Sequence, residues 1–192
     1  MNASDVLRRI TDALDRAGIQ YMLTGSFASA YHGAPRSTQD IDFVIEASPE
    51  QLKTLIQSLP ETQYYVDLTA ALEAHRRQSM FNAIDLDSGW KVDFVLRKDR
   101  PFSKEEFSRR SQVTLHGVSI FVASAEDVII AKLEWSELAQ SQRQIEDVAA
   151  ILKVRFDGLD KRYAEKWVEH LGLTKQWSEA RRIAGLDPSA ST

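Results

Sequence analysis

The chain has 192 residues, 43% hydrophobic and 27% charged, which suits one globular domain, or a core domain with a small helical extension. Its mean hydropathy is −0.32, and no apolar run approaches the roughly 20 residues that a membrane-spanning helix needs. The absence of cysteine excludes disulfides, zinc–thiolate sites and cysteine nucleophiles. A net charge of −4 and a pI near 5.6 argue against bulk nucleic-acid binding, so no DNA partner is expected. The first residues lack the pattern of a signal peptide, and we expect a cytoplasmic location and no membrane partner.

Hydrophobic periodicity and turn residues predict alternating helices and strands in the first two thirds of the chain. In chain order we expect a helix over 5–17, a strand over 19–24, a short helix over 27–32 and a strand over 38–45. A helix over 49–58, capped by Ser48, and an ambiguous segment over 61–77, helical from 68, follow. The last elements of this part are a hairpin of 80–86 with 91–96, a short helix over 104–110, and a hairpin of 112–116 with 118–122.

The remainder of the sequence is predicted to be helical. A helix capped by Ser124 reaches about residue 138, a second covers 142–152, and two more lie within 159–184. We therefore expect a core domain over 1–123, a C-terminal helical portion over 124–186 packed on that core, and a flexible tail over 187–192.

Two aspartates stand one residue apart on the predicted strand over 38–45. Because side chains alternate along a strand, Asp40 and Asp42 share one face, while Ile41 and Phe43 point into the core. Like charges at that distance repel each other, and a divalent cation removes this cost. The pattern indicates a metal site, with a solvent-exposed strand edge as the alternative.

A third acid is needed to complete a site for two metal ions. Asp93 is the best candidate, because it is the lone acid in an apolar strand and a buried, unpaired carboxylate is costly. Asp85 is the second choice and Asp87, a natural turn residue, the third. We predict that Asp40, Asp42 and Asp93 are catalytic and bind two Mg²⁺ ions, for which Mn²⁺ can substitute.

Several other residues are suited to binding phosphate. Gly25 lets the backbone approach a phosphate closely, and Ser26 offers a hydroxyl and an amide at a helix N-terminus. Arg36 either clamps a phosphate or pairs with a nearby acid.

The run Gly25-Ser26, the block from Arg36 through Thr38 to Asp42, and the later Asp93 resemble the nucleotidyltransferase superfamily related to DNA polymerase beta. The resemblance implies an α/β (α+β) fold with a short mixed β-sheet flanked by helices and a C-terminal helical portion. It also implies that the glycine–serine pair binds the β and γ phosphates of a nucleotide and that the three acids hold the metals.

Within that superfamily, the chain most resembles bacterial nucleotidyltransferases of the abortive-infection, toxin–antitoxin type, which carry a downstream lysine and an arginine–aspartate cluster. Lys132 matches the lysine, and the segment from Arg143 to Asp147 resembles the cluster, with Gln144 where the toxin family usually has aspartate. Lys132 and Arg143 are therefore predicted to bind nucleotide. The residues alone leave alternatives open: Lys132 could pair with Glu126 or Asp127, and Arg143 with Asp147 one helical turn away, while Asp147 could also act as a base.

The resemblance implies magnesium-dependent transfer of a nucleoside monophosphate from an NTP to a hydroxyl of tRNA, a protein or a small molecule. It also implies a role in a toxin–antitoxin pair, with a cognate toxin or antitoxin as partner. The alternative is a catalytically silent nucleotide-binding or antitoxin-like protein. A third hypothesis is RNA binding by the basic segment 97–110, for which a solvated loop and helix face is the plainer interpretation.

Overall fold

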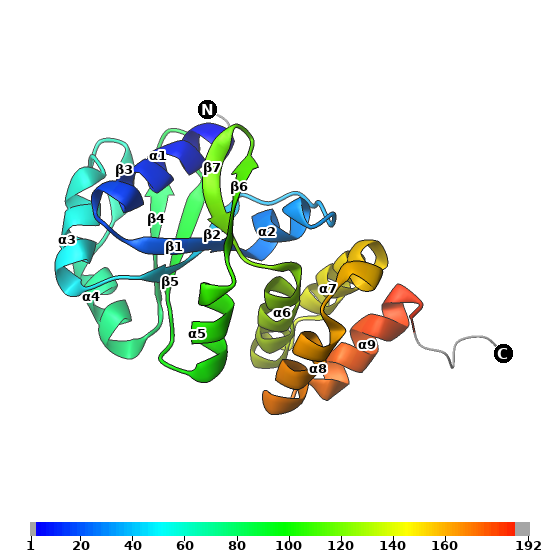
Figure 1. Ribbon diagram of the computed structural model, residues 1–192. Coiled ribbons are helices and arrows are strands. Elements are labelled where there is room, and N and C mark those ends of the chain that lie inside the picture. Colours follow the sequence, from blue (N-terminus) through cyan, green and yellow to red (C-terminus); the bar gives the residue numbers. More distant parts are fainter. Residues whose placement is uncertain (1–2, 187–192) are drawn as a thin grey trace. The chain divides into compact units, whose positions relative to one another are not determined.

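The structure is a computed structural model that describes residues 3–186, and the chain forms two compact units (Figure 1). The first unit contains the residues up to Phe27 together with Ser37–Ala123. The second contains Ala28–Arg36 and the residues from Ser124 onward. The tail predicted over 187–192 lies outside the described residues.

Within residues 3–186, seven strands of the first unit form one sheet in the order β3-β4-β5-β2-β1-β7-β6. The pairs β2–β5 and β1–β7 are parallel and the other neighbours are antiparallel, which confirms the predicted mixed sheet. The strands are β1 (Gln20–Thr24), β2 (Asp40–Glu46), β3 (Tyr64–Val66), β4 (Met80–Asp85), β5 (Lys91–Leu96), β6 (Ser111–Leu115) and β7 (Val118–Val122).

The helices that begin in the first unit are α1 (Ala3–Arg16), α2 (Gly25–Tyr31), α3 (Pro49–Ser58), α4 (Leu68–Arg77) and α5 (Pro101–Ser108). The predicted cap of α3 is confirmed, because the Ser48 hydroxyl accepts the Gln51 amide while the Gln51 side chain accepts the Ser48 amide.

Two local predictions need correction. Helix α5 begins at Pro101, three residues earlier than expected, because proline suits the first helical position, and the helix ends before Arg109. The ambiguous segment before α4 contains the short strand β3, which pairs antiparallel with β4.

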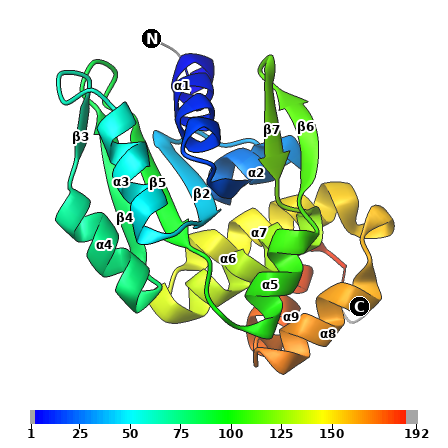
Figure 2. The ribbon, with the colours of Figure 1, turned by 60° about the vertical axis from the view of Figure 1, so that its left-hand side comes forward.

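One face of the sheet carries the aromatic core of the first unit. Phe43, Phe94 and Phe81 stand on three neighbouring strands, and their rings stack with centroids 6.3 and 5.0 Å apart. Tyr21 meets Phe43 edge-on at 5.7 Å. Helices α1 and α3 lie on the same side of the sheet (Figure 2), and Arg9 of α1 reaches the sheet here. Residues one position along each strand therefore point to the opposite face.

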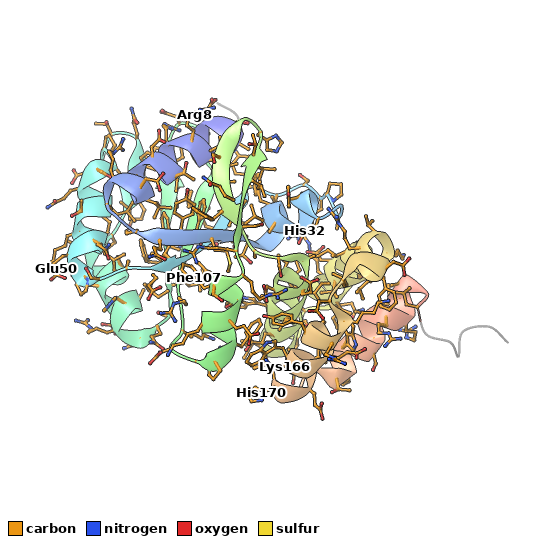
Figure 3. All side chains as sticks on the ribbon, in the orientation of Figure 1. Arg8, His32, Glu50, Phe107, Lys166 and His170 are labelled. Carbon is orange, nitrogen blue, oxygen red and sulfur yellow. The ribbon has the colours of Figure 1, made fainter. Side chains whose placement is uncertain are left out.

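The second unit is built mainly from the C-terminal helices α6 (Ala125–Ala139), α7 (Gln142–Arg155), α8 (Lys161–His170) and α9 (Thr174–Ala184), with a 3₁₀ turn at Phe156–Gly158. These helices confirm the predicted C-terminal helical region. Side chains such as Leu133, Val148 and Trp167 are buried in its core. His170 packs edge-on against Trp167, and Lys166 lies over the same ring. Figure 3 labels Lys166 and His170 on α8. Between residues 3 and 186, no helix is both long and apolar enough to cross a membrane.

Candidate active site

A row of polar side chains crosses the face of the sheet opposite the aromatic core of the first unit. The strand register aligns Thr24 of β1, Asp42 of β2, Asp93 of β5 and Asn82 of β4. Asp42 and Asp93 are thus direct neighbours across the parallel β2–β5 pair, and Asp40 stands on the same face two residues before Asp42. The structure therefore brings the three predicted acids together on one surface.

The three acids differ in burial. The Asp40 side chain is 52% exposed, Asp42 is half-buried, and Asp93 is only 5% exposed. The Oδ1 atom of Asp93 is buried and has no hydrogen-bond partner in the part of the chain that the structure describes. Such an oxygen is costly unless a ligand or ion binds it.

Lys91 is a site residue that the sequence reasoning missed. Its Nζ donates to Asp93 Oδ2 at 2.8 Å and lies 3.4 Å from Asp40 Oδ1. The hydrogen bond to Asp93, with the charges of Asp93 and Asp40, raises the pKa of Lys91. The signal was available, because a residue two positions before Asp93 on a strand must share its face.

Gly25, at the start of α2, lies against Asp42. Its φ is +61°, and a Cβ added there would lie 2.0 Å from Asp42 Oδ2 and 2.6 Å from Asp42 Cγ. Only glycine permits both this backbone conformation and this close approach. Ser26 follows in the first turn of α2 and is 5% exposed.

Asp85, the second choice for the third acid, has structural partners instead. It is fully buried, pairs with Arg9 at 2.5 Å, and accepts hydrogen bonds from the Ser88 amide and hydroxyl at 2.9 and 2.7 Å. Burial raises the pKa of Asp85, but the Ser88 hydrogen bonds and the Arg9 charge outweigh it and hold the pKa below its ordinary value. Asp87 is exposed after the β4 strand. Neither competes with Asp93 as a partner of Asp42.

The acids fit a hard divalent cation in their chemistry, although no three acidic or histidine side chains within residues 3–186 converge closely enough to enclose a metal ion. Carboxylate oxygens are the ligands that Mg²⁺ prefers, and Mg²⁺ keeps several waters, so few protein ligands suffice. The buried Asp93 oxygen beside Asp42, which no described residue hydrogen-bonds, is the feature that fits such an ion.

In the second unit, Asp147 of α7 joins two cations. Its Oδ2 accepts from Lys132 Nζ at 2.7 Å and from Arg36 Nε at 3.0 Å. Arg36 thus makes the structural pairing that was one of its two expected roles.

Lys132 of α6 is 4% exposed, and its Nζ also donates to Gln144 at 3.0 Å. Asp147 is a partner for Lys132 that was not anticipated from the sequence. The intrahelical pair between Arg143 and Asp147, which was the alternative to nucleotide binding by Arg143, does not form among the described residues. Arg143 is exposed on the first turn of α7.

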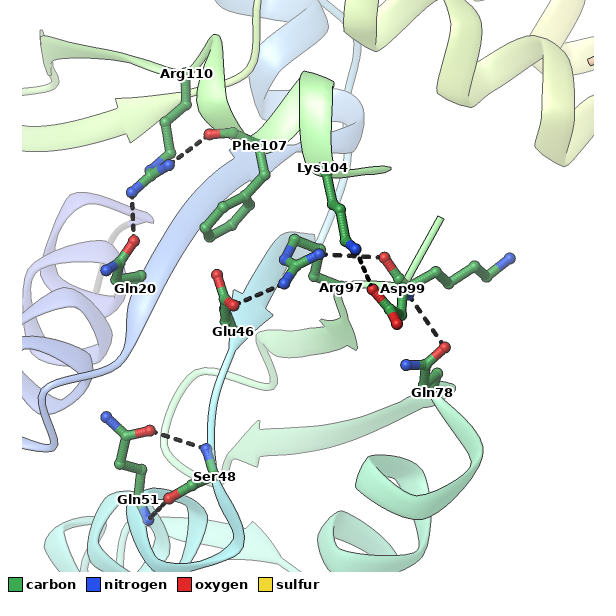
Figure 4. Close-up of polar contacts among 11 residues, drawn as sticks. Gln20, Glu46, Ser48, Gln51, Gln78, Arg97, Asp99, Lys104, Phe107 and Arg110 are labelled. Carbon is green, nitrogen blue, oxygen red and sulfur yellow. Dashed lines mark hydrogen bonds and ion pairs between the residues drawn. The ribbon is translucent and has the colours of Figure 1, made fainter. Parts of the chain in front are cut away.

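The basic segment 97–110 belongs to the first unit, and several of its cations are engaged there (Figure 4). Arg97 pairs with Glu46 at 2.6 Å and Lys104 with Asp99 at 2.5 Å. Arg110 donates to Gln20 at 2.8 Å, and its guanidinium lies 4.2 Å from the centroid of the Phe107 ring. These contacts favour a structural role over an RNA-binding patch.

A mixed sheet with acids side by side on β2 and β5, and a glycine turn packed against one of them, defines a nucleotidyltransferase fold. A match over residues 4–182 shows that the chain belongs to the family described as nucleotidyltransferase of unknown function (DUF6036). A search of curated proteins finds no match.

Solved structures share this fold at low sequence identity. The solution structure of the antibiotic-resistance factor ANT(2'')-Ia matches with a TM-score of 0.59 and 13% identity, over 95% of this chain and 98% of that one. The lincomycin-bound lincosamide antibiotic adenylyltransferase LnuA matches with a TM-score of 0.54 and 14% identity, over 80% and 98%. An antigenic nucleotidyltransferase-like protein from Paracoccidioides brasiliensis matches with a TM-score of 0.52 and 15% identity, over 92% and 91%. Identities this low show the fold alone.

Proposed function

We propose that this protein transfers a nucleoside monophosphate from an NTP to a hydroxyl group and requires Mg²⁺, with Mn²⁺ as a substitute. The observation that carries the proposal is the pairing of Asp42 with Asp93, whose buried Oδ1 lacks a hydrogen-bond partner within residues 3–186. A protein retains such an oxygen at a cost, and a ligand or ion that binds it offsets that cost. Membership of a nucleotidyltransferase family supports the same reaction.

The three acids are proposed to have two roles, metal binding and proton transfer. Asp40, Asp42 and Asp93 would hold the metal, which when bound stabilises charge on the α-phosphate and on the leaving pyrophosphate. Asp93 is also proposed to accept the proton of the acceptor hydroxyl, on a carboxylate oxygen that does not bind the metal. The hydroxyl oxygen then bonds to the α-phosphorus as the bond from that phosphorus to the pyrophosphate oxygen breaks.

Five residues are proposed to bind the phosphates of the nucleotide. Gly25 and Ser26, at the start of α2, supply backbone amides and a hydroxyl for the β and γ phosphates. Arg36, Lys132 and Arg143 are proposed as further phosphate-binding cations on the strength of the sequence motif and not of their placement.

The acceptor is a hydroxyl of tRNA, a protein or a small molecule. LnuA is named as an antibiotic adenylyltransferase, so small-molecule hydroxyls, including those of aminoglycosides and lincosamides, should be tested first. A toxin–antitoxin role with a cognate partner protein, in the cytoplasm where NTPs and Mg²⁺ are plentiful, is the biological setting proposed from the sequence.

The reaction can be tested with α-³²P-labelled NTPs, Mg²⁺ and panels of small alcohols, total tRNA and cell proteins. We expect the α label to appear on the acceptor and the label of γ-³²P-NTP to leave as pyrophosphate. Asp42→Asn should reduce transfer at least about 100-fold, as expected for lost transition-state stabilisation. Asp87→Asn is the matched control, because Asp87 is an exposed aspartate away from the acidic row, and it should leave transfer unchanged.

Two results would contradict the proposal. Transfer that persists in Asp42→Asn would place the chemistry elsewhere. Nucleotide binding without transfer to any acceptor would favour the alternative, a catalytically silent nucleotide-binding or antitoxin-like protein.

A further inference from the structure

Lys91 lies among the acids of the candidate active site. We propose that Lys91 is an internal counter-ion, which neutralises Asp40 and Asp93 in the metal-free protein and leaves them when a divalent cation binds. This inference rests on the proposed function, because it assigns a role to Lys91 in the metal binding that the function requires.

The contacts place the ammonium between the carboxylates. Lys91 Nζ donates to Asp93 Oδ2 at 2.8 Å and lies 3.4 Å from Asp40 Oδ1. The strand register explains the arrangement, because Lys91 is the direct neighbour of Asp40 across the β2–β5 pair and precedes Asp93 by two residues on the same face. Three acids share this face, and within a few ångströms of one another their charges repel.

This ion pair differs from an ordinary surface pair. The Asp93 side chain is 7% exposed, so water solvates its charge poorly. Water therefore screens the attraction between Asp93 and Lys91 less than it screens a pair of two exposed side chains. Lys91 itself is 39% exposed. A lysine with its head near solvent and a flexible stem can leave its partners at little steric cost.

A divalent cation and the ammonium compete for the same groups. Lys91 already uses one oxygen of Asp93 and faces one oxygen of Asp40, while Asp93 Oδ1 has no hydrogen-bond partner in the described part of the chain. A metal ion bound to these carboxylates would stand a few ångströms from the ammonium, and the two positive charges would repel. Metal binding therefore has to displace Lys91.

Lys91→Met tests the proposal, because it removes the charge and keeps most of the stem. Mn²⁺ binding to the nucleotide-free protein can be measured from the electron paramagnetic resonance signal of free Mn²⁺. We expect Lys91→Met to bind Mn²⁺ on the order of 10-fold more tightly than the wild type, since a repelling charge is gone. Lys91→Arg keeps the charge and should bind like the wild type. Lys104→Met is the matched control, because Lys104 pairs with Asp99 away from the acidic row.

Thermal unfolding gives a second readout. In EDTA, Lys91→Met should melt at a lower temperature than the wild type, since Asp93 loses its counter-ion, and Mn²⁺ should raise its melting temperature more than that of the wild type. A third measurement needs no variant: in ¹⁵N-lysine-labelled wild type, Mg²⁺ should shift the Nζ resonance of Lys91 and leave that of Lys104 in place.

The outcomes separate this inference from the proposed function. Equal or weaker Mn²⁺ binding by Lys91→Met, or an unmoved Lys91 resonance at saturating Mg²⁺, would overturn the role of Lys91 while transfer by the wild type still stood. A wild type that binds no metal with or without nucleotide, and transfers nothing, would overturn both.

Discussion

Gly25→Ala tests the close approach of the β1–α2 turn to Asp42. At φ +61° an alanine costs about 1 kcal/mol relative to glycine. The added Cβ would lie 2.0 Å from Asp42 Oδ2 and 2.9 Å from Asp42 Cβ, so the carboxylate must rotate away and the two backbones must also move apart, which adds about 1–3 kcal/mol. We expect the free energy of unfolding, measured by urea titration, to fall by about 2–4 kcal/mol. Nucleotidyl transfer should fall as well, because Asp42 is moved.

Gly117→Ala is the matched control for this variant. Gly117 has φ +74° in the same unit, but a Cβ there would meet no atom of the described residues within 4 Å. Its substitution should therefore cost only the backbone term, about 1 kcal/mol, and leave transfer intact. If the two variants lose the same stability, the reasoning about the Asp42 contact is refuted.

Two further predictions concern buried ion pairs. The pKa of Asp85 is lowered in the folded state, so its stabilisation is present above the unfolded value near 3.9 and is lost as pH falls through the folded value. At pH 7, Asp85→Asn should lower the free energy of unfolding by about 1–3 kcal/mol, a range kept low because Arg9 is 31% exposed and water screens the pair. In urea titrations from pH 7 to pH 2, the difference in unfolding free energy between this variant and the wild type should shrink below about pH 4. Lys132→Met should lower the free energy of unfolding by about 2 kcal/mol in the same assay. Asp147→Asn should lower it more, because Asp147 contacts both Lys132 and Arg36. Equal losses would mean that the Arg36–Asp147 pair adds no stability.

Elements with strong local signals could be predicted from the sequence. The Ser48–Gln51 capping box and Pro49 fix the start of α3, and both are local features. Strand β3 could not be predicted, because three residues are too few to show a period of two. Only its pairing with β4 defines it, with Tyr64 buried and Tyr65 exposed.

The candidate site could be predicted in part, because some of its features also have strong local signals in the sequence. Alternation along β2 places Asp40 and Asp42 on one face without any tertiary information. The adjacency of Asp42 and Asp93 depends on a parallel pairing across a long connection, and the sequence contains no signal for that register. Contacts that cross between elements, such as Lys132 with Asp147, likewise arise only from packing.

Asp93 and Asp147 differ in how much of their charge other side chains already compensate, and this difference favours different roles for them. Asp147 gives one oxygen to both Lys132 and Arg36, so two cations already balance it. Asp93 has one lysine at Oδ2 and a buried Oδ1 with no partner among the described residues. An oxygen in that state can accept a metal ion or a proton, whereas binding a metal at Asp147 would first require breaking two ion pairs. We therefore propose Asp93 as the acid that takes part in the chemistry, whereas the two ion pairs of Asp147 favour a structural role within the second unit.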